Sequence, residues 1–123
     1  MTVQLDHTIV AAHDNEVSAA FLADILGLPS PTRLGHFVAV EVANGVTLDF
    51  MSTDEPLTPQ HYAFSVSEAE FDDAFERIRA QGLEYWADPF KSRPGQIRQH
   101  EVSRSLYFED PSGHLLEILT RPG

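Results

Sequence analysis

The stretch "GHLLEIL" at residues 113–119 decides how the fold of this chain is interpreted. Glu117 has an apolar neighbour on each side, and Leu115 and Leu119 lie two positions away. In a strand, side chains alternate between the two faces, so Glu117 shares its face with these two leucines. Both faces of such a strand are expected to be buried, and a buried carboxylate without a partner is costly. The stretch therefore predicts that Glu117 binds something.

The same pattern occurs earlier in the chain, in "GVTLDFM" at residues 45–51. In both copies a Gly comes first, a Leu follows three positions later and an acid four positions later, so Asp49 matches Glu117. The segment "HTIV" that starts at His7 likewise returns as "HYAF" at His61. The chain therefore contains an internal repeat, in which each half carries a His on its first strand and an acid on its last.

The expected order of elements is strand, helix and two or three strands, given twice. Asp14 can cap a helix over about 15–27, and Ser67 with Glu70 forms a capping box for a second helix. The expected strands cover 3–10, 36–42, 46–51, 61–66, 105–110 and 114–120, and "LEYWADP" at 83–89 is expected to form a further, short strand. "PSPTR" at 29–33 is expected to be a connector, and 90–103 a loop with some pairing at a sheet edge.

Length and composition narrow the class of protein. A chain of 123 residues with 42% hydrophobic residues predicts one compact globular domain. A net charge of −11 argues against nucleic acid and against an anionic membrane surface as partners. The absence of Cys excludes disulfides, thiolate ligands and Cys nucleophiles. No segment has the pattern of a signal peptide or a membrane span, so we expect a cytoplasmic protein.

Two His and two acids at equivalent places in a repeat point to a metal site. If the halves are related by a pseudo-twofold axis and their sheets face each other, His7, His61, Asp49 and Glu117 converge. Two imidazoles with one or two carboxylates suit a divalent ion such as iron, manganese, nickel or zinc. Coordination would offset the cost of burying Glu117. The alternative is a buried hydrogen-bond network between the acids and the His side chains.

Three segments resemble the vicinal oxygen chelate superfamily, which includes glyoxalase I, extradiol dioxygenases, fosfomycin-modifying thiol transferases and bleomycin-binding resistance proteins. They are "LDHTIV", "QHYAFSVSEAEFDDAFERI" and, above all, "LYFEDPSGHLLEILTRP". The resemblance implies an α+β fold in one domain, with βαβββ modules at about 1–53 and 60–123. These modules form a cup-shaped mixed half-barrel in this family, the glyoxalase-like fold.

The resemblance also implies a set of site residues. It places the metal ligands at His7, His61 and Glu117. Asp49 falls where glyoxalase I has a fourth, carboxylate ligand; if it does not bind the metal, Asp49 can act as general base. Small members of the family commonly form homodimers in which module one of one chain faces module two of the other, so we expect a homodimer with sites at the interface.

The implied chemistry is Lewis-acid catalysis on a small oxygen-chelating organic substrate. Tyr107 lies ten residues before Glu117, as does a Tyr of the extradiol dioxygenases, and is given a catalytic role; its other interpretation is a pocket wall or core aromatic. Those enzymes also carry a His nine residues before that Tyr, where this chain has Arg98, and the nearest His is His100. Thiol transferases need an anion pocket, whereas glyoxalase I needs a glutathione site, for which no motif is present.

A second function stays open beside the enzyme. Some family members bind an aromatic antibiotic in the same cup without turnover, typically after losing the metal ligands. The retained His7, His61 and Glu117 favour the enzyme. The residues predicted to bind the substrate or drug are Arg98, Arg104, His100, Trp86 and Phe50.

Overall fold

The chain divides into two compact units, Met1–Thr58 and Pro59–Gly123. The structure is a computed structural model that describes residues 2–121. The boundary between the units falls between the two expected modules. Each unit is described by itself below, and the closing of the two sheets into one half-barrel domain stays a prediction.

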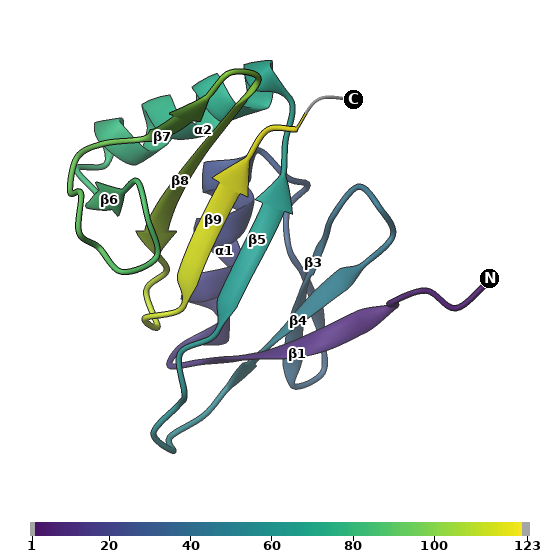
Figure 1. Cartoon of the computed structure of the whole chain (residues 1–123). Coiled ribbons are helices and arrows are strands. Elements are labelled where there is room, and N and C mark those ends of the chain that lie inside the picture. Colours follow the sequence, from purple (N-terminus) through teal and green to yellow (C-terminus); the bar gives the residue numbers. More distant parts are fainter. Residues whose placement is uncertain (1, 122–123) are drawn as a thin grey trace. The chain divides into compact units, whose positions relative to one another are not determined.

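Unit 1 is a four-stranded sheet with one helix (Figure 1). The strand order is β1-β4-β3-β2; β1 is parallel to β4, and the other neighbours are antiparallel. The helix α1 contacts β3 and β4 most extensively. The elements are β1 (His7–Ala12), α1 (Asn15–Leu26), β2 (Thr32–Leu34), β3 (Phe37–Glu41) and β4 (Thr47–Ser52).

Unit 2 repeats this plan with one additional short strand. The order is β5-β9-β8-β6, β5 is parallel to β9, and β7 pairs with the same strand β8 that β6 joins. Figure 1 shows β5 and the yellow β9 side by side. The elements are β5 (His61–Ser65), α2 (Glu68–Ala80), β6 (Tyr85–Trp86), β7 (Arg98–His100), β8 (Ser103–Glu109) and β9 (Leu115–Leu119).

The strand register confirms the repeat. In unit 1, Ile9 of β1 pairs with Asp49 of β4. In unit 2, Ala63 of β5 pairs with Glu117 of β9. In both units the acid is therefore opposite the residue two places after the His, and paired residues of parallel strands share a face. The α+β fold class with two such modules is confirmed.

Alternation along the strands separates a core face from an open face in each sheet. In β9, Leu116 and Ile118 are buried, whereas Leu115, Glu117 and Leu119 are half-buried. The expectation that both faces of this strand are fully buried is therefore wrong. The core of unit 2 lies on one face only, and the other face carries Glu117.

Two short strands differ from the sequence-based expectation. β2 lies in a segment that was expected to be a connector, and it pairs with β3 across a turn at Gly35, whose φ is +63°. β7 lies in the expected loop and pairs with β8 at the sheet edge. All six residues of β2 and β7 are exposed, so these edge strands lack the apolar alternation that identifies a strand in sequence.

The predicted helix starts are confirmed by their caps. The Asp14 side chain accepts hydrogen bonds from the backbone N–H groups of Glu16 and Val17. The Ser67 hydroxyl accepts from the Glu70 N–H, and the Glu70 carboxylate accepts from the Ser67 N–H in return. No helix among residues 2–121 is long and apolar enough to cross a membrane.

We predict that Ser67→Ala lowers the free energy of unfolding by about 1 kcal/mol, because it leaves a helix N–H without its acceptor. Hydrogen bonds from the Ser67 backbone and side chain lower the pKa of Glu70. Their contribution is therefore present above the pKa of an unfolded Glu and is lost as pH falls through the lowered value. Urea denaturation at several pH values measures both effects. The exposed Ser30→Ala is the control, and equal losses in the two variants would contradict the prediction.

Candidate functional site

Three side chains from neighbouring strands share the open face of the unit 2 sheet. Tyr107 of β8 is directly opposite Glu117 of β9, and Glu117 is paired with Ala63 of β5. His61 lies two residues before Ala63 and so points to the same face. The sequence folds this way because the three strands are adjacent and in register, which brings together three polar groups that are distant in the chain.

Glu117 contacts both of these neighbours. Its Oε1 lies 3.0 Å from the Nε2 of His61. The His61 and Tyr107 rings are 5.7 Å apart between centroids. The Glu117 side chain is 13% exposed and that of His61 45%, so the carboxylate is the shielded member of the pair. The interaction partners that the sequence predicts for Glu117 are therefore present in unit 2.

Tyr107 is held as a neutral phenol. Burial raises the pKa of Tyr107, and the negative charge of Glu117 and a hydrogen bond to it raise the pKa further, against an opposing effect of the Arg98 charge. At neutral pH the phenol therefore keeps its proton, and it donates that proton in a hydrogen bond to Glu117. This hydrogen bond orients the Glu117 carboxylate.

A buried His fixes the start of the strand that carries His61. His114 is 1% exposed, and its Nδ1 accepts a hydrogen bond of 2.9 Å from the backbone N–H of Gln60. The Gln60 carbonyl accepts from the Leu115 N–H, also at 2.9 Å. The N–H of His114 is bonded in turn to the carboxylate of Asp110 in the turn. His114 therefore connects the turn that precedes β9 to the backbone that precedes β5.

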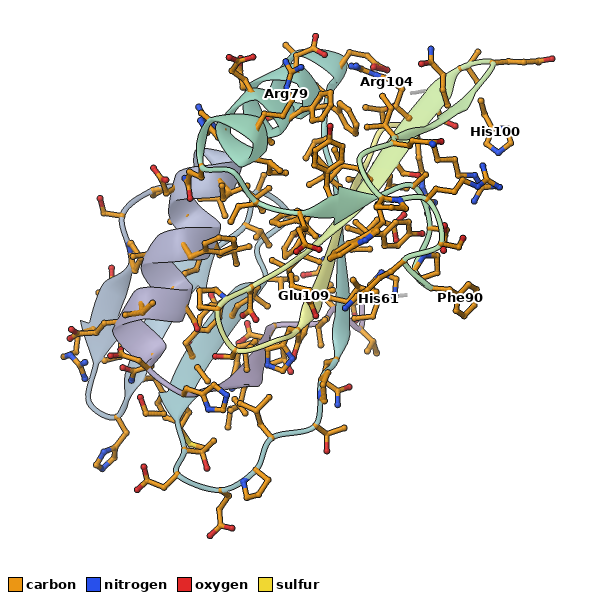
Figure 2. The ribbon with its side chains drawn as sticks, turned by 90° about the vertical axis from the view of Figure 1, so that its left-hand side faces the viewer. His61, Arg79, Phe90, His100, Arg104 and Glu109 are labelled. Atoms are coloured by element: carbon orange, nitrogen blue, oxygen red, sulfur yellow. The ribbon has the colours of Figure 1, made fainter. Side chains whose placement is uncertain are left out.

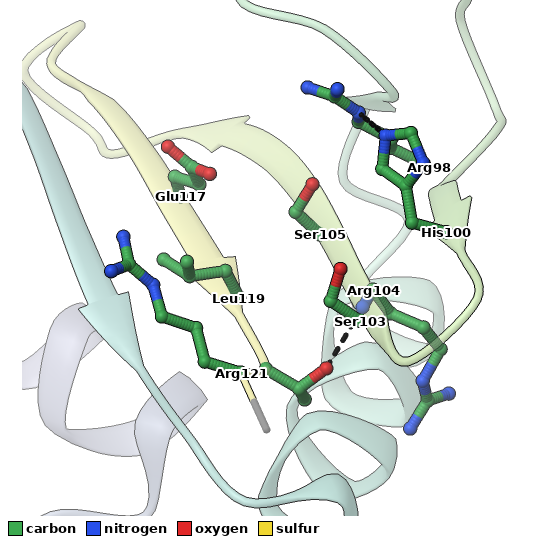
Figure 3. A pocket seen from close by; sticks show the side chains of 9 residues that line it. Arg98, His100, Ser103, Arg104, Ser105, Glu117, Leu119 and Arg121 are labelled. Carbon is green, nitrogen blue, oxygen red and sulfur yellow. Dashed lines mark hydrogen bonds between the residues drawn. The ribbon is translucent and has the colours of Figure 1, made fainter. Parts of the chain in front are cut away.

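A pocket of about 270 Å³ opens beside Glu117 (Figure 3). It brings the predicted Arg98 and His100 together with Glu117, and Arg98 Nε donates to His100 Nε2 over 3.0 Å. Sequence reasoning missed its further polar members, because small hydroxyls and a terminal Arg carry no pattern. The lining residues are Arg98, His100, Ser103, Arg104, Ser105, Glu117, Leu119, Thr120 and Arg121.

Arg104 is one of the lining residues, but its guanidinium is bound to the neighbouring helix α2, beside which Figure 2 labels it. Its guanidinium binds Glu68 and Asp72 of α2 at 2.7 and 2.8 Å and lies 4.3 Å from the Phe71 ring centroid. Figure 3 shows this guanidinium turned away from the pocket. Alternation along β8 explains the difference, because Arg104 lies on the opposite face from Ser103 and Ser105.

The two aromatic residues predicted to bind substrate are buried. Phe50 is 3% exposed and lies on the core face of β4, opposite to that of its neighbour Asp49, so unit 1 leaves little of its surface for a ligand. Trp86 pairs with Tyr107 and shares its face, but only 6% of it is exposed. The ammonium of Lys91 lies 4.9 Å from the Trp86 ring centroid. Trp86 therefore lies beside Tyr107 on the neighbouring strand and has little surface left for a ligand.

The polar pair of unit 1 is more open than that of unit 2. His7 is exposed, and its Nδ1 lies 2.7 Å from Asp6 Oδ2. That hydrogen bond and the charge of Asp6 raise the pKa of His7, and the charge of Asp49 adds to them. Such a bond to Nδ1 leaves Nε2 as the ring nitrogen available to a metal ion. Asp49 is half-buried on the same face of the sheet.

The residues present fit a divalent ion in donor type and spacing. Two donors each about 2.1 Å from one ion are about 3 Å apart when they bind at right angles, which matches the distance between His61 Nε2 and Glu117 Oε1. Among residues 2–121, no three His, Asp or Glu side chains are grouped closely enough to hold an ion by themselves. Unit 2 therefore offers two candidate donors, one nitrogen and one oxygen. His7 and Asp49 occupy the corresponding strand positions in unit 1, and their part in a metal site stays a prediction.

Residues 4–118 match the family model of the Glyoxalase/Bleomycin resistance protein/Dioxygenase superfamily. The chain belongs to this superfamily. This match confirms the resemblance that the three sequence segments indicated, and with it the glyoxalase-like fold.

Solved structures and a curated relative resemble the chain over nearly its whole length. Oxidase ChaP-H2 is 61% identical, with a TM-score of 0.95, and covers 99% of this chain and 96% of its own. Oxidase ChaP-H1 is 55% identical, with the same TM-score, and covers 98% of both. The metallothiol transferase FosB of Lysinibacillus sphaericus is 31% identical over 98% of this chain and 84% of its own length. These relatives are named as enzymes, which supports an enzyme of this superfamily.

We predict that Glu117→Gln lowers the pKa of Tyr107 toward its ordinary value, because the variant removes the negative charge that disfavours tyrosinate. Ultraviolet absorbance titration of the phenols measures this pKa, and Tyr107→Phe identifies which of the three Tyr signals belongs to Tyr107. Glu109→Gln is the matched control, since Glu109 is paired with Lys91. An unchanged Tyr107 pKa in Glu117→Gln would show that the two side chains do not interact.

Proposed function

We propose that this chain is a metal-dependent oxidase that acts on a small organic substrate bound through two adjacent oxygens. The contact between His61 Nε2 and Glu117 Oε1 carries the proposal, because it pairs two good metal donors on an open sheet face beside a pocket. The identity of 61% and 55% with two oxidases supports the reaction class.

His61, Glu117 and His7 would hold the ion, with Asp49 as a fourth ligand or as a base. When bound, the ion supplies Lewis-acid stabilisation of negative charge on substrate oxygens and, if it is iron or manganese, electron exchange. We further propose that the protein is a cytoplasmic homodimer in which unit 1 of one chain completes the site on unit 2 of the other.

The chain's own groups have separate tasks in this proposal. Tyr107 holds Glu117 in one orientation through its hydrogen bond. Arg98 and His100 provide polar contacts to substrate in the pocket beside Glu117. If Asp49 does not bind the ion, its carboxylate accepts the proton that a substrate hydroxyl loses on binding.

Thiol transfer is the second candidate, because the chain is 31% identical to a metallothiol transferase. Binding of an aromatic antibiotic without turnover is the third candidate, and the retained His61–Glu117 pair counts against it. The first two candidates need a metal and differ in the co-substrate, which is oxygen for one and a thiol for the other. The third needs neither.

We predict that protein purified without chelator carries stoichiometric divalent metal and consumes oxygen with a substrate such as protocatechuate or catechol. Glu117→Gln is expected to lose the metal, since an amide is a much weaker ligand than a carboxylate, while circular dichroism stays unchanged. Elemental analysis and an oxygen electrode measure the two results, with Glu109→Gln as the control. Stoichiometric metal in Glu117→Gln would refute the ligand assignment, and thiol consumption with fosfomycin without oxygen uptake would favour the transferase.

We predict that Asp49→Asn weakens metal binding less than Glu117→Gln does. The reason is that Asp49 is used as a ligand in only part of the family pattern, whereas Glu117 already lies within 3.0 Å of a second donor. Competition with a chromophoric chelator gives both dissociation constants. A larger loss in Asp49→Asn would make Asp49 the principal carboxylate ligand.

A further inference from the structure

We propose that the pocket beside Glu117 binds a carboxylate of the substrate through Arg98 and Arg121. The inference rests on the proposed function for the chelating end of the substrate and deepens it, because it makes the substrate a small organic acid. One end of the substrate then meets the His61–Glu117 pair, and its carboxylate meets the two guanidinium groups.

The distribution of ion pairs carries this proposal. The chain has eight Lys and Arg against nineteen Asp and Glu, so carboxylate partners are abundant. Several cations have such a partner within hydrogen-bond distance, namely Arg33, Arg79, Lys91 and Arg104. Within residues 2–121, neither Arg98 nor Arg121 has an ion pair, although both line the same pocket. Two unpaired guanidinium groups in one pocket of so acidic a chain indicate a site for an anion that comes from outside.

The geometry of Arg98 favours a planar oxyanion. The only side-chain hydrogen bond of Arg98 among the described residues runs from its Nε to His100 Nε2, over 3.0 Å. This bond fixes the plane of the guanidinium, and it leaves the two terminal nitrogens for a ligand. A guanidinium edge with two N–H groups matches the two oxygens of a carboxylate. His100 accepts at Nε2, so this nitrogen holds the Arg98 guanidinium in place and is not itself a donor to the anion.

The rest of the pocket adds hydrogen-bond donors and sets the orientation. The Ser105 hydroxyl projects from β8 on the same side of the sheet as the Glu117 carboxylate (Figure 3). Within this pocket Arg98 and Arg121 attract an anion, whereas Glu117 repels it. The anionic group of a ligand is therefore directed toward the guanidinium groups and away from the Glu117 carboxylate.

The size of the pocket limits the ligand. A volume of about 270 Å³ is near the lower end for small-molecule sites. Such a pocket suits an acid with one ring or a short chain rather than a nucleotide or a peptide. A single carboxylate also suffers less repulsion from a chain of net charge −11 than a multiply charged phosphate does.

Calorimetric titration of the full-length, metal-free chain with benzoate and with inorganic phosphate tests the anion site independently of any metal. We expect benzoate to bind more tightly than phosphate. Arg98→Gln and Arg121→Gln should each weaken benzoate binding by roughly tenfold, because each removes a charge-assisted hydrogen-bond partner. Arg33→Gln, whose guanidinium is paired with Glu16, should leave benzoate binding unchanged.

Titration of the metal-loaded chain with protocatechuate and catechol then separates this inference from the proposed function. The two ligands share a chelating diol and differ in one carboxylate. We expect protocatechuate to bind roughly tenfold more tightly than catechol, and this advantage to vanish in Arg98→Gln. Equal binding of the two diols, or tighter binding of phosphate than benzoate, would overturn the carboxylate site and leave the metal proposal standing. Binding of benzoate by a chain that takes up no metal would overturn the metal proposal and leave the carboxylate site standing.

Discussion

The contact between Glu117 and His61 is the constraint on which unit 2 depends. A carboxylate that is 13% exposed on an apolar strand loses most of its hydration, and such a loss costs several kcal/mol unless other groups replace the water. His61, 3.0 Å away, and the Tyr107 hydroxyl supply the replacement. The same arrangement that makes Glu117 tolerable in the metal-free chain also places two good donors side by side.

The parallel pairing of the first and last strands generates this arrangement in both halves. In each unit the acid is opposite the residue two places after the His, so both lie on one face of adjacent strands. The contact between the His and the acid nevertheless differs between the two units. Asp49 is one methylene shorter than Glu117, and His7 is bonded to Asp6, with no hydrogen bond to Asp49 among the described residues. In unit 1, His7 is therefore more exposed and bonded to a different acid, whereas in unit 2 His61 and Glu117 are hydrogen-bonded to each other.

Much of the fold and part of the candidate site could be predicted from the sequence. The repeat, the helix caps and the long strands follow from apolar alternation and from local hydrogen-bonding residues such as Asp14 and Ser67. The pairing of His61 with Glu117 follows once the repeat is recognised. The exposed edge strands β2 and β7 could not be found, because no buried face imposes alternation on them. Phe50 shows a further difficulty, because the sequence alone does not say which face of β4 is buried, and Phe50 lies on the core face while its neighbour Asp49 lies on the other.

Arginine residues show where sequence reasoning ends. Arg98 and Arg104 are equally basic in the sequence, and both contribute to the lining of the pocket, but the Arg104 guanidinium is paired with two carboxylates of α2. Only the distances between side chains distinguish a cation available to a ligand from one used in packing. Arg121 likewise belongs to no sequence pattern that would indicate a site, although it lines the pocket with Arg98.

The most direct test of the central claim is a crystal structure of the metal-loaded chain, with the ion located by its anomalous scattering. The account predicts an ion within about 2.3 Å of both His61 Nε2 and Glu117 Oε1, with a His7 imidazole as a further ligand. An ion bound elsewhere, with His61 and Glu117 still hydrogen-bonded directly to each other, would contradict it.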